Sequence, residues 1–223
     1  MDISDFENAK EILEYLKRSV RPEKLEPKKG LFIYEEFRGG FFIPDGGFRE
    51  PATEDFYKAA ILLAEAEGDL LTAARIAERA VDEGYDDFRR IAGKLYEKAY
   101  KQAETVIEKA FIHHEAFELK NVESFFPSGY SSPLELYMEA IEEAEKESSK
   151  KALEVARRFR FSCGPDYLRL YVKVNGQIPE GWARLLVKYF SVDRYLRKLE
   201  ERGRKEHADE IRRLIEEFRR KKE

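Results

Sequence analysis

The chain has little that is chemically reactive or thermally labile. It contains one cysteine, Cys163, which excludes an internal disulfide framework and a zinc site built from several cysteines. Asparagine and glutamine are also scarce, whereas Asp, Glu, Lys and Arg make up 39% of the 223 residues. This combination is typical of the ion-pair networks of heat-adapted proteins. We therefore predict a thermophilic, cytoplasmic protein.

Long apolar runs are missing as well. No stretch approaches the ~18 consecutive apolar residues of a membrane span, and the opening residues carry acids where a signal peptide carries bases. Charge is almost balanced, with 41 Lys and Arg against 45 Asp and Glu, so no overall basic field attracts a polyanion. We expect a protein that is neither secreted nor membrane-embedded, and nucleic-acid binding would need a local basic patch.

Phosphate-binding glycine motifs are absent too. The glycine-rich stretch FRGGFFIPDGGF at residues 37–48 fits neither GxGxxG nor GxxxxGK[ST]. Its Gly-Gly pair lies between aromatic and β-branched residues, which predicts a tight β-hairpin followed by a second turn. The aromatic side chains of this hairpin are expected to form a small core against helices; an exposed subset would instead form a candidate binding patch, Phe37, Phe41, Phe42 and Phe48.

Most of the remaining chain has the periodicity of amphipathic helices. Beyond an N-terminal helix, this periodicity predicts helices over about 54–67 and 70–83, and one long helix over about 88–117. Ser132, Pro133 and Glu135 combine a capping box with proline at the first helical position, which predicts a further helix as far as Phe159.

The segment from Tyr167 to Val174 is ambiguous. Its apolar residues alternate from Leu168 onward, which favours a short strand, but Tyr167, Tyr171 and Val174 also fit one face of a helix. The C-terminal residues return to helical periodicity.

Residues 62–84, LLAEAEGDLLTAARIAERAVDEG, resemble the middle of a tetratricopeptide repeat. Gly68 and Asp69 match the turn between that family's two antiparallel helices, and Ala73 and Ala80 match small positions of its second helix. The resemblance covers about a quarter of the chain and implies helix pairs that bind macromolecules through exposed faces. Generic helical hairpins packed into a bundle are the alternative.

The same stretch and its continuation are also similar to the opening of HEPN domains, which are all-α modules. Asp69-Leu70 and Glu97-Lys98-Ala99 match that family's residues. HEPN ribonucleases use an arginine followed closely by a histidine, a spacing that Arg202 and His207 share. The resemblance implies RNA binding or metal-independent RNA cleavage, with Arg202 stabilising the phosphate and His207 transferring a proton. The alternative is a solvated helix face.

Two further features bear on metal binding and on catalysis: the histidine pair at residues 113–114 and Cys163. On a helical wheel His114 falls in the apolar stripe, His113 on its flank and Glu115 on the opposite side, so these residues do not converge on a metal ion. We expect a hydrogen-bonded, buried histidine, and neither a metal nor another cofactor. Cys163 would be a reactive thiol if a helix N-terminus lowered its pKa. It lacks a recognisable nucleophile motif, so we expect a buried or incidental thiol.

Together these patterns predict a mainly α protein of antiparallel helical hairpins, in a bundle or tetratricopeptide-like, with a small N-terminal aromatic β-hairpin. Residues 1–50 would form the appendage and 51–223 the helical domain, with a candidate sub-boundary near 161–180. The expected function is non-catalytic binding of a protein partner or self-association; the alternative is the HEPN-like activity towards RNA. Gly68 distinguishes them, because the hairpin interpretation breaks the helix there and the HEPN interpretation runs through it.

Overall fold

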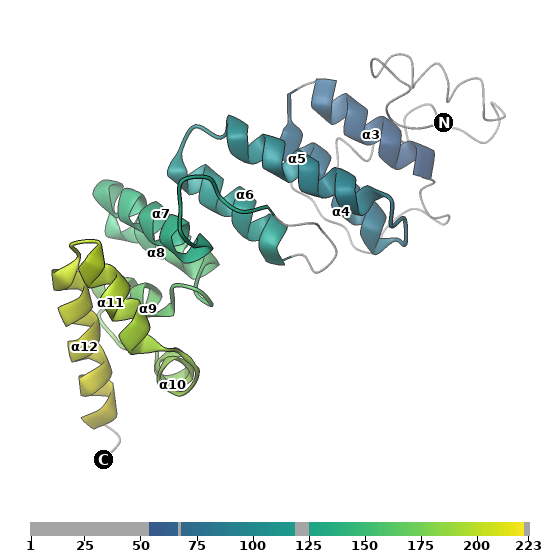
Figure 1. Ribbon diagram of the computed structural model, residues 1–223. Coiled ribbons are helices and arrows are strands. Elements are labelled where there is room, and N and C mark those ends of the chain that lie inside the picture. Colours follow the sequence, from purple (N-terminus) through teal and green to yellow (C-terminus); the bar gives the residue numbers. More distant parts are fainter. Residues whose placement is uncertain (1–53, 67, 119–124, 221–223) are drawn as a thin grey trace. The chain divides into compact units, whose positions relative to one another are not determined.

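The computed structural model describes residues 54–66, 68–118 and 125–220. Within these ranges the protein consists of ten α-helices and contains no β-strand (Figure 1). The predicted mainly helical fold is confirmed for this part of the chain. The expected N-terminal helix, the β-hairpin and the boundary near residue 50 lie outside the described residues. None of the helices described combines the length and the hydropathy needed to cross a bilayer.

The chain divides into two compact units. Unit 1 extends to Glu104 and includes Phe111–Phe125, and unit 2 holds Thr105–Ala110 and the chain from Phe126 onward. The division falls within one helix, α6 (Val106–Glu118).

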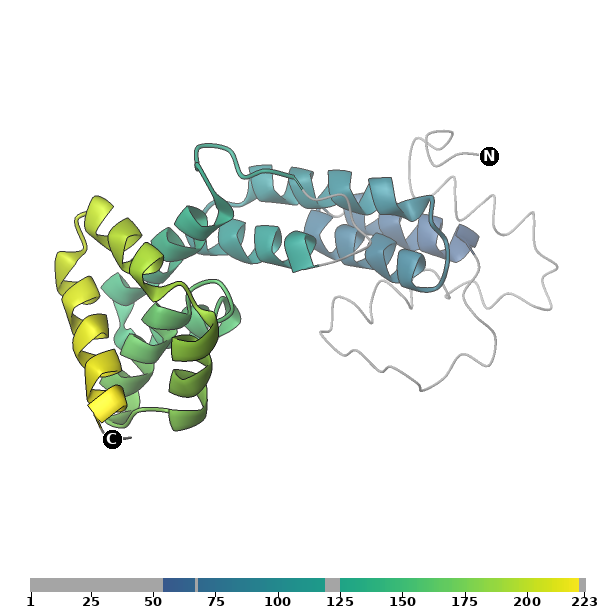
Figure 2. The same ribbon diagram turned by 60° about the horizontal axis from the view of Figure 1, so that its bottom comes forward.

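Three consecutive helices pack side by side in unit 1: α3 (Glu54–Ala66), α4 (Leu70–Asp82) and α5 (Phe88–Gln102) (Figures 1 and 2). Helix α4 contacts both of the others. Ala73, Ala77 and Ala80 of α4 are completely buried. Such small side chains allow neighbouring helices to approach closely.

The chain turns between α3 and α4 at Gly68 and Asp69. Gly68 has a left-handed φ of 79°, which glycine adopts without the strain that a Cβ would cause. Asp69 begins α4, because its Oδ1 accepts a hydrogen bond from the backbone N–H of Thr72 at 3.1 Å. The predicted hinge is confirmed, and the continuous helix expected from the HEPN resemblance is wrong.

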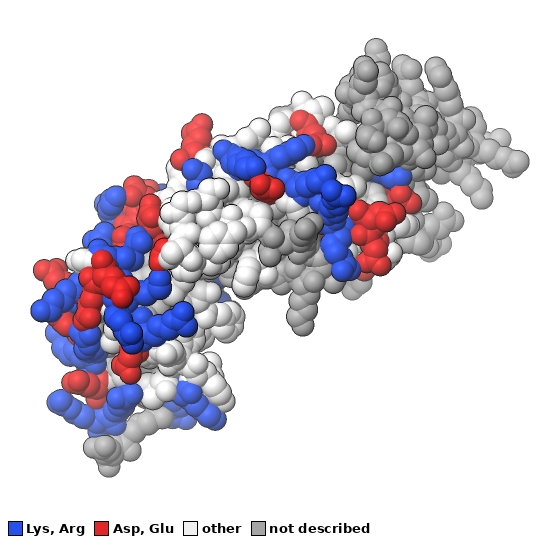
Figure 3. Space-filling model, in the orientation of Figure 1, with Lys and Arg blue, Asp and Glu red and all other residues white. Residues whose placement is uncertain are grey.

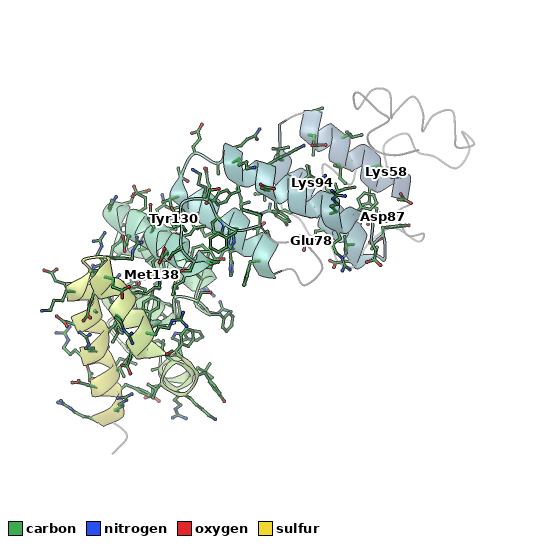
Figure 4. All side chains as sticks on the ribbon, in the orientation of Figure 1. Lys58, Glu78, Asp87, Lys94, Tyr130 and Met138 are labelled. Atoms are coloured by element: carbon green, nitrogen blue, oxygen red, sulfur yellow. The ribbon has the colours of Figure 1, made fainter. Side chains whose placement is uncertain are left out.

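Two polar contacts tie the helices of unit 1 together. Glu78 extends from α4 (Figure 4), and its Oε2 accepts a hydrogen bond from the Tyr96 hydroxyl of α5 at 2.8 Å. The Arg75 guanidinium of α4 donates from Nε and Nη2 to both carboxylate oxygens of Glu115 in α6, at 3.0 and 2.8 Å. Bidentate pairs of this kind fix both the angle and the register of two helices.

The single long helix predicted over residues 88–117 is wrong. Helix α5 ends at Gln102, Ala103 is extended with φ −60° and ψ 132°, and α6 begins at Val106. The Thr105 Oγ accepts from the N–H of Glu108, while the Glu108 carboxylate accepts from the N–H of Thr105, both at 3.1 Å. This reciprocal capping box starts a new helix.

Unit 2 contains six consecutive helices beyond the start of α6: α7 (Pro133–Glu147), α8 (Ser149–Arg158), α9 (Gly164–Asn175), α10 (Glu180–Tyr189), α11 (Val192–Glu201) and α12 (Lys205–Arg220). Helix α9 is central, because it packs against α8, α10 and α12. Its Leu168 and Leu170 are both completely buried, although they lie on different sides of the helix.

Two predictions within unit 2 are wrong. The helix expected from Pro133 to Phe159 starts as predicted, but it is interrupted at Ser148, which is extended and whose Oγ accepts from the N–H of Lys151 at 3.1 Å. The strand expected over 168–174 is helical. Its alternating pattern arises because α9 is covered on several sides, so that apolar residues are not confined to one face.

Candidate binding surface

The residues predicted to carry function are placed only in part. Phe37, Phe41, Phe42 and Phe48 lie outside the described residues. The Arg202 guanidinium contacts the Glu142 carboxylate of α7, at 3.3 Å from Nε and 3.4 Å from Nη2.

His207 also faces α7, with its Nε2 3.9 Å from a carboxylate oxygen of Glu145. Burial, assisted by the Arg169 cation, lowers the pKa of His207 below its ordinary value. Arg202 and His207 are therefore directed at carboxylates one turn apart on the same helix, and an RNA phosphate would have to compete with Glu142 for the guanidinium.

The neighbouring histidines of α6 are both buried. The His113 Nε2 lies 3.2 Å from the backbone oxygen of Phe125, a distance at which the neutral ring donates a hydrogen bond. This confirms the expected hydrogen-bonded, buried histidine. In the part of the chain that the structure describes, no group of three or more His, Cys, Asp and Glu side chains is arranged to hold a metal ion.

A buried group of ionised side chains lies at the centre of unit 2. The side chain of Arg169 in α9 is only 1% exposed. It donates from Nε to Asp166 Oδ1 at 2.9 Å, and from Nη1 and Nη2 to the Glu145 carboxylate at 2.9 and 2.7 Å. The Tyr195 hydroxyl of α11 donates to the second Asp166 oxygen at 2.7 Å. We call Glu145, Asp166, Arg169 and Tyr195 the ion cluster.

The ion cluster is arranged to hold helices together rather than to react. It connects α7, α9 and α11, and its polar groups are directed at one another. Beside it, the Cys163 thiol is fully buried, and burial with the nearby Asp166 carboxylate raises its pKa, so the unreactive thiol predominates. The prediction of a buried thiol is confirmed.

An aromatic cluster lies on the surface of unit 2, where α9 and α10 meet. The ring of Trp182 is in edge-to-face contact with three others: Tyr167 at 5.5 Å, Phe161 at 5.9 Å and Phe190 at 6.2 Å between centroids. Tyr167 is also 5.9 Å from Tyr171 on the next turn of α9. These rings, which come from separate segments of unit 2, restrict the movement of the Trp182 side chain.

This cluster continues into an exposed apolar stripe on α10. Trp182, Leu185 and Tyr189 occupy positions i, i+3 and i+7, which lie on one side of a helix. Leu185 is 46% exposed, Tyr189 68% and Phe161 63%. We call Phe161, Tyr167, Tyr171, Trp182, Leu185, Tyr189 and Phe190 the aromatic surface.

Cations border the aromatic surface. The guanidinium of Arg160 lies 4.9 Å from the centre of the Phe161 ring, and the Lys188 ammonium lies 5.0 Å from that of Tyr189, both within cation–π range. Arg184 is one residue from Leu185 and is exposed. In Figure 3 the surface at α10 is mainly uncharged and basic, whereas acidic and basic side chains alternate over α11 and α12.

Gly164 allows the aromatic surface to form. A Cβ at this position would lie 2.9 Å from Phe190 Cζ and 3.0 Å from Leu186 Cδ1. We predict that Gly164→Ala displaces the Phe190 ring, lowers the free energy of unfolding by about 1–2 kcal/mol and shifts the fluorescence of Trp182, the only tryptophan.

Gly181 is the matched control, because a Cβ there meets nothing within 4 Å. Gly181→Ala should leave the Trp182 spectrum unchanged and stabilise α10 by about 0.5–1 kcal/mol. Equal spectra and stabilities for the two variants, measured by fluorescence during urea unfolding, would contradict the role assigned to Gly164.

Sequence reasoning did not identify the aromatic surface. The signal was present in the α10 sequence EGWARLLVKY, which has too many large apolar residues for the narrow buried face of a short helix. Only Ala183 and Leu186 of α10 are fully buried. A helix with this composition must expose some of its apolar side chains.

Comparison with protein-family models, with curated proteins and with solved structures finds no match to this chain. The resemblances to tetratricopeptide and HEPN proteins rest on the residues named above.

Proposed function

We propose that the protein is a non-catalytic binding protein and that the aromatic surface of unit 2 docks another protein. The observation that carries this proposal is the run of apolar side chains from the exposed Phe161 across the half-buried Trp182 to the exposed Leu185 and Tyr189. Connected apolar patches rimmed by polar groups are typical of interaction sites, whereas isolated exposed apolar residues are common on any surface.

The residue types support the same function. Trp, Tyr and Arg are enriched among the residues that contribute most to protein–protein affinity. The Trp182 ring contacts Phe161, Tyr167 and Phe190, so little side-chain freedom remains to be lost when a partner binds. By contrast, Glu145, Asp166 and Arg169 of the ion cluster are paired with one another.

The experiment compares three forms of the full chain as bait in lysate of the source organism: the wild type, the double variant Leu185→Ser/Tyr189→Ser, and Phe126→Ser. Phe126 is a matched control, since it is 63% exposed in the same unit but outside the aromatic surface. Circular dichroism establishes that each form is folded.

We expect one protein to be captured by the wild type and by Phe126→Ser. The double variant should bind it about 30-fold or more weakly, as the loss of ~2 kcal/mol from an interface hot spot implies. Equal capture by all three forms, or a wild type that only self-associates in sedimentation velocity, contradicts the proposal. RNA that the wild type cleaves, with cleavage lost in His207→Ala, would instead favour the HEPN-like activity.

A further inference from the structure

We infer that the segment docking on the aromatic surface is an acidic amphipathic helix. This inference rests on the proposed function and adds the charge and the shape of the partner. It is carried by three observations: the cations around the surface, the local charge of the chain, and the geometry of the α10 stripe.

The cations at this border lack close carboxylate partners among the described residues. Arg160 contacts the Phe161 ring and the backbone oxygen of Arg157, and Lys188 contacts the Tyr189 ring. Arg184 approaches only the exposed Glu180, at 3.8 Å. By comparison, Arg169 and Lys173 contact the Glu145 carboxylate at 2.7 and 2.9 Å. Carboxylates of a partner would form ion pairs with the three cations at this border.

The charge of the surrounding segment also favours an acidic partner. Residues 157–194 contain eight Lys and Arg and three Asp and Glu, a net charge of +5 in a chain whose net charge is −4. Arg169 and Lys173 are paired with Glu145 of α7, but the other six cations still outnumber the three acids of the segment that carries the aromatic surface. Such an excess of cations steers an acidic partner to this site and disfavours docking of basic segments.

The geometry favours a helix. The stripe from Trp182 to Tyr189 extends about 10 Å along α10, forming a ridge that can pack against the side chains of a second helix. The backbone of α10 is already hydrogen-bonded within the helix, so it has no strand edge to which an extended peptide could add.

The two sides of the stripe determine where the partner carries its acids. Arg184 and Lys188 lie beyond Leu185 on the helical wheel, and Arg160 lies beyond Trp182 through its contact with Phe161. The partner should have apolar residues at i, i+3 or i+4, and i+7, with Asp or Glu on both flanks. RNA is a less suitable ligand for this surface than an acidic helix. Leu185 has no ring on which a base could stack, and a cation already covers one face of Phe161 and one face of Tyr189.

The test uses the full chain and three probes. Two are synthetic helical peptides of about 18 residues that share one Leu/Phe stripe and differ only in having Glu or Lys at the other positions, since shorter helices are marginal in water. The third is single-stranded oligouridylate. None contains tryptophan, so the fluorescence of Trp182 reports occupancy of the surface.

We expect the Glu peptide to bind at least tenfold more tightly than the Lys peptide and the oligouridylate, with an affinity that falls as salt is added. Arg184→Glu/Lys188→Glu should reverse the preference. Lys205→Glu/Arg213→Glu, which makes the same charge change at exposed positions of α12, should leave it unchanged.

Three outcomes would overturn the inference: equal affinity for both peptides, binding of neither peptide, or tighter binding of the oligouridylate. They are distinguishable from failure of the proposed function. If the two peptides bind equally, the charge inferred for the partner is wrong, but docking at Leu185 and Tyr189 is unaffected. If Leu185→Ser/Tyr189→Ser retains the captured protein, the docking proposal itself fails.

Discussion

Replacing Arg169 with methionine should lower the free energy of unfolding by about 3–5 kcal/mol, the range found when one partner of a buried ion pair is removed. Methionine leaves the Glu145 and Asp166 carboxylates buried without the guanidinium that donates to both. The measurement is urea-induced unfolding followed by circular dichroism, with wild type and variant at the same pH and salt concentration.

Lys173→Met is the matched control. Lys173 also contacts the Glu145 carboxylate, at 2.9 Å, but its side chain is 46% exposed, so its removal should cost less than about 1 kcal/mol. Adding Glu145→Leu to Arg169→Met should restore part of the lost stability, because one uncompensated buried charge is then removed. Similar losses for Arg169→Met and Lys173→Met would show that the ion cluster does not stabilise unit 2.

Acidification should destabilise unit 1 through His113. Burial lowers the pKa of His113 from 6.5 to about 4, with a smaller contribution from the neighbouring His114. Between these values the unfolded chain binds a proton that the folded unit does not. Stability is therefore fully present above pH 6.5 and is lost as the pH falls towards 4, by about 3 kcal/mol for a shift of this size.

The variant His113→Gln isolates this effect. Its amide nitrogen can donate to the Phe125 carbonyl from a position close to that of Nε2, but it does not titrate. The difference in unfolding free energy between wild type and variant should change by about 3 kcal/mol between pH 7 and pH 4. Because His207 titrates equally in both forms, it cancels in this comparison; a constant difference would contradict the assignment.

The helical fold was predictable because its signals are local. The periodicity of apolar residues indicated the helices, and Gly68 with Asp69 indicated the first hinge. The breaks at Ala103 and Ser148 escaped detection because the apolar stripe resumes in nearly the same phase beyond each of them. The deciding signals are side-chain bonds to the backbone, from Thr105 and Glu108 in one case and from Ser148 in the other.

The candidate site was less predictable because it depends on which helices meet. Arg169 is spaced like any exposed arginine, and only the packing of α7, α9 and α11 brings Glu145, Asp166 and Tyr195 around it. The aromatic surface likewise depends on Trp182 of α10 meeting Tyr167 of α9. The aromatic patch expected at residues 37–48 rests on composition alone and stays a prediction.

The order of helices in unit 1 has a consequence for how the chain acquires its structure. Helix α3 packs on α4, and α4 packs on α5, across connections of only a few residues. Little loop-closure entropy opposes such neighbouring contacts, and chains dominated by them reach their native state rapidly. We therefore expect these three helices to assemble as they emerge from the ribosome, before the residues of the ion cluster have been synthesised.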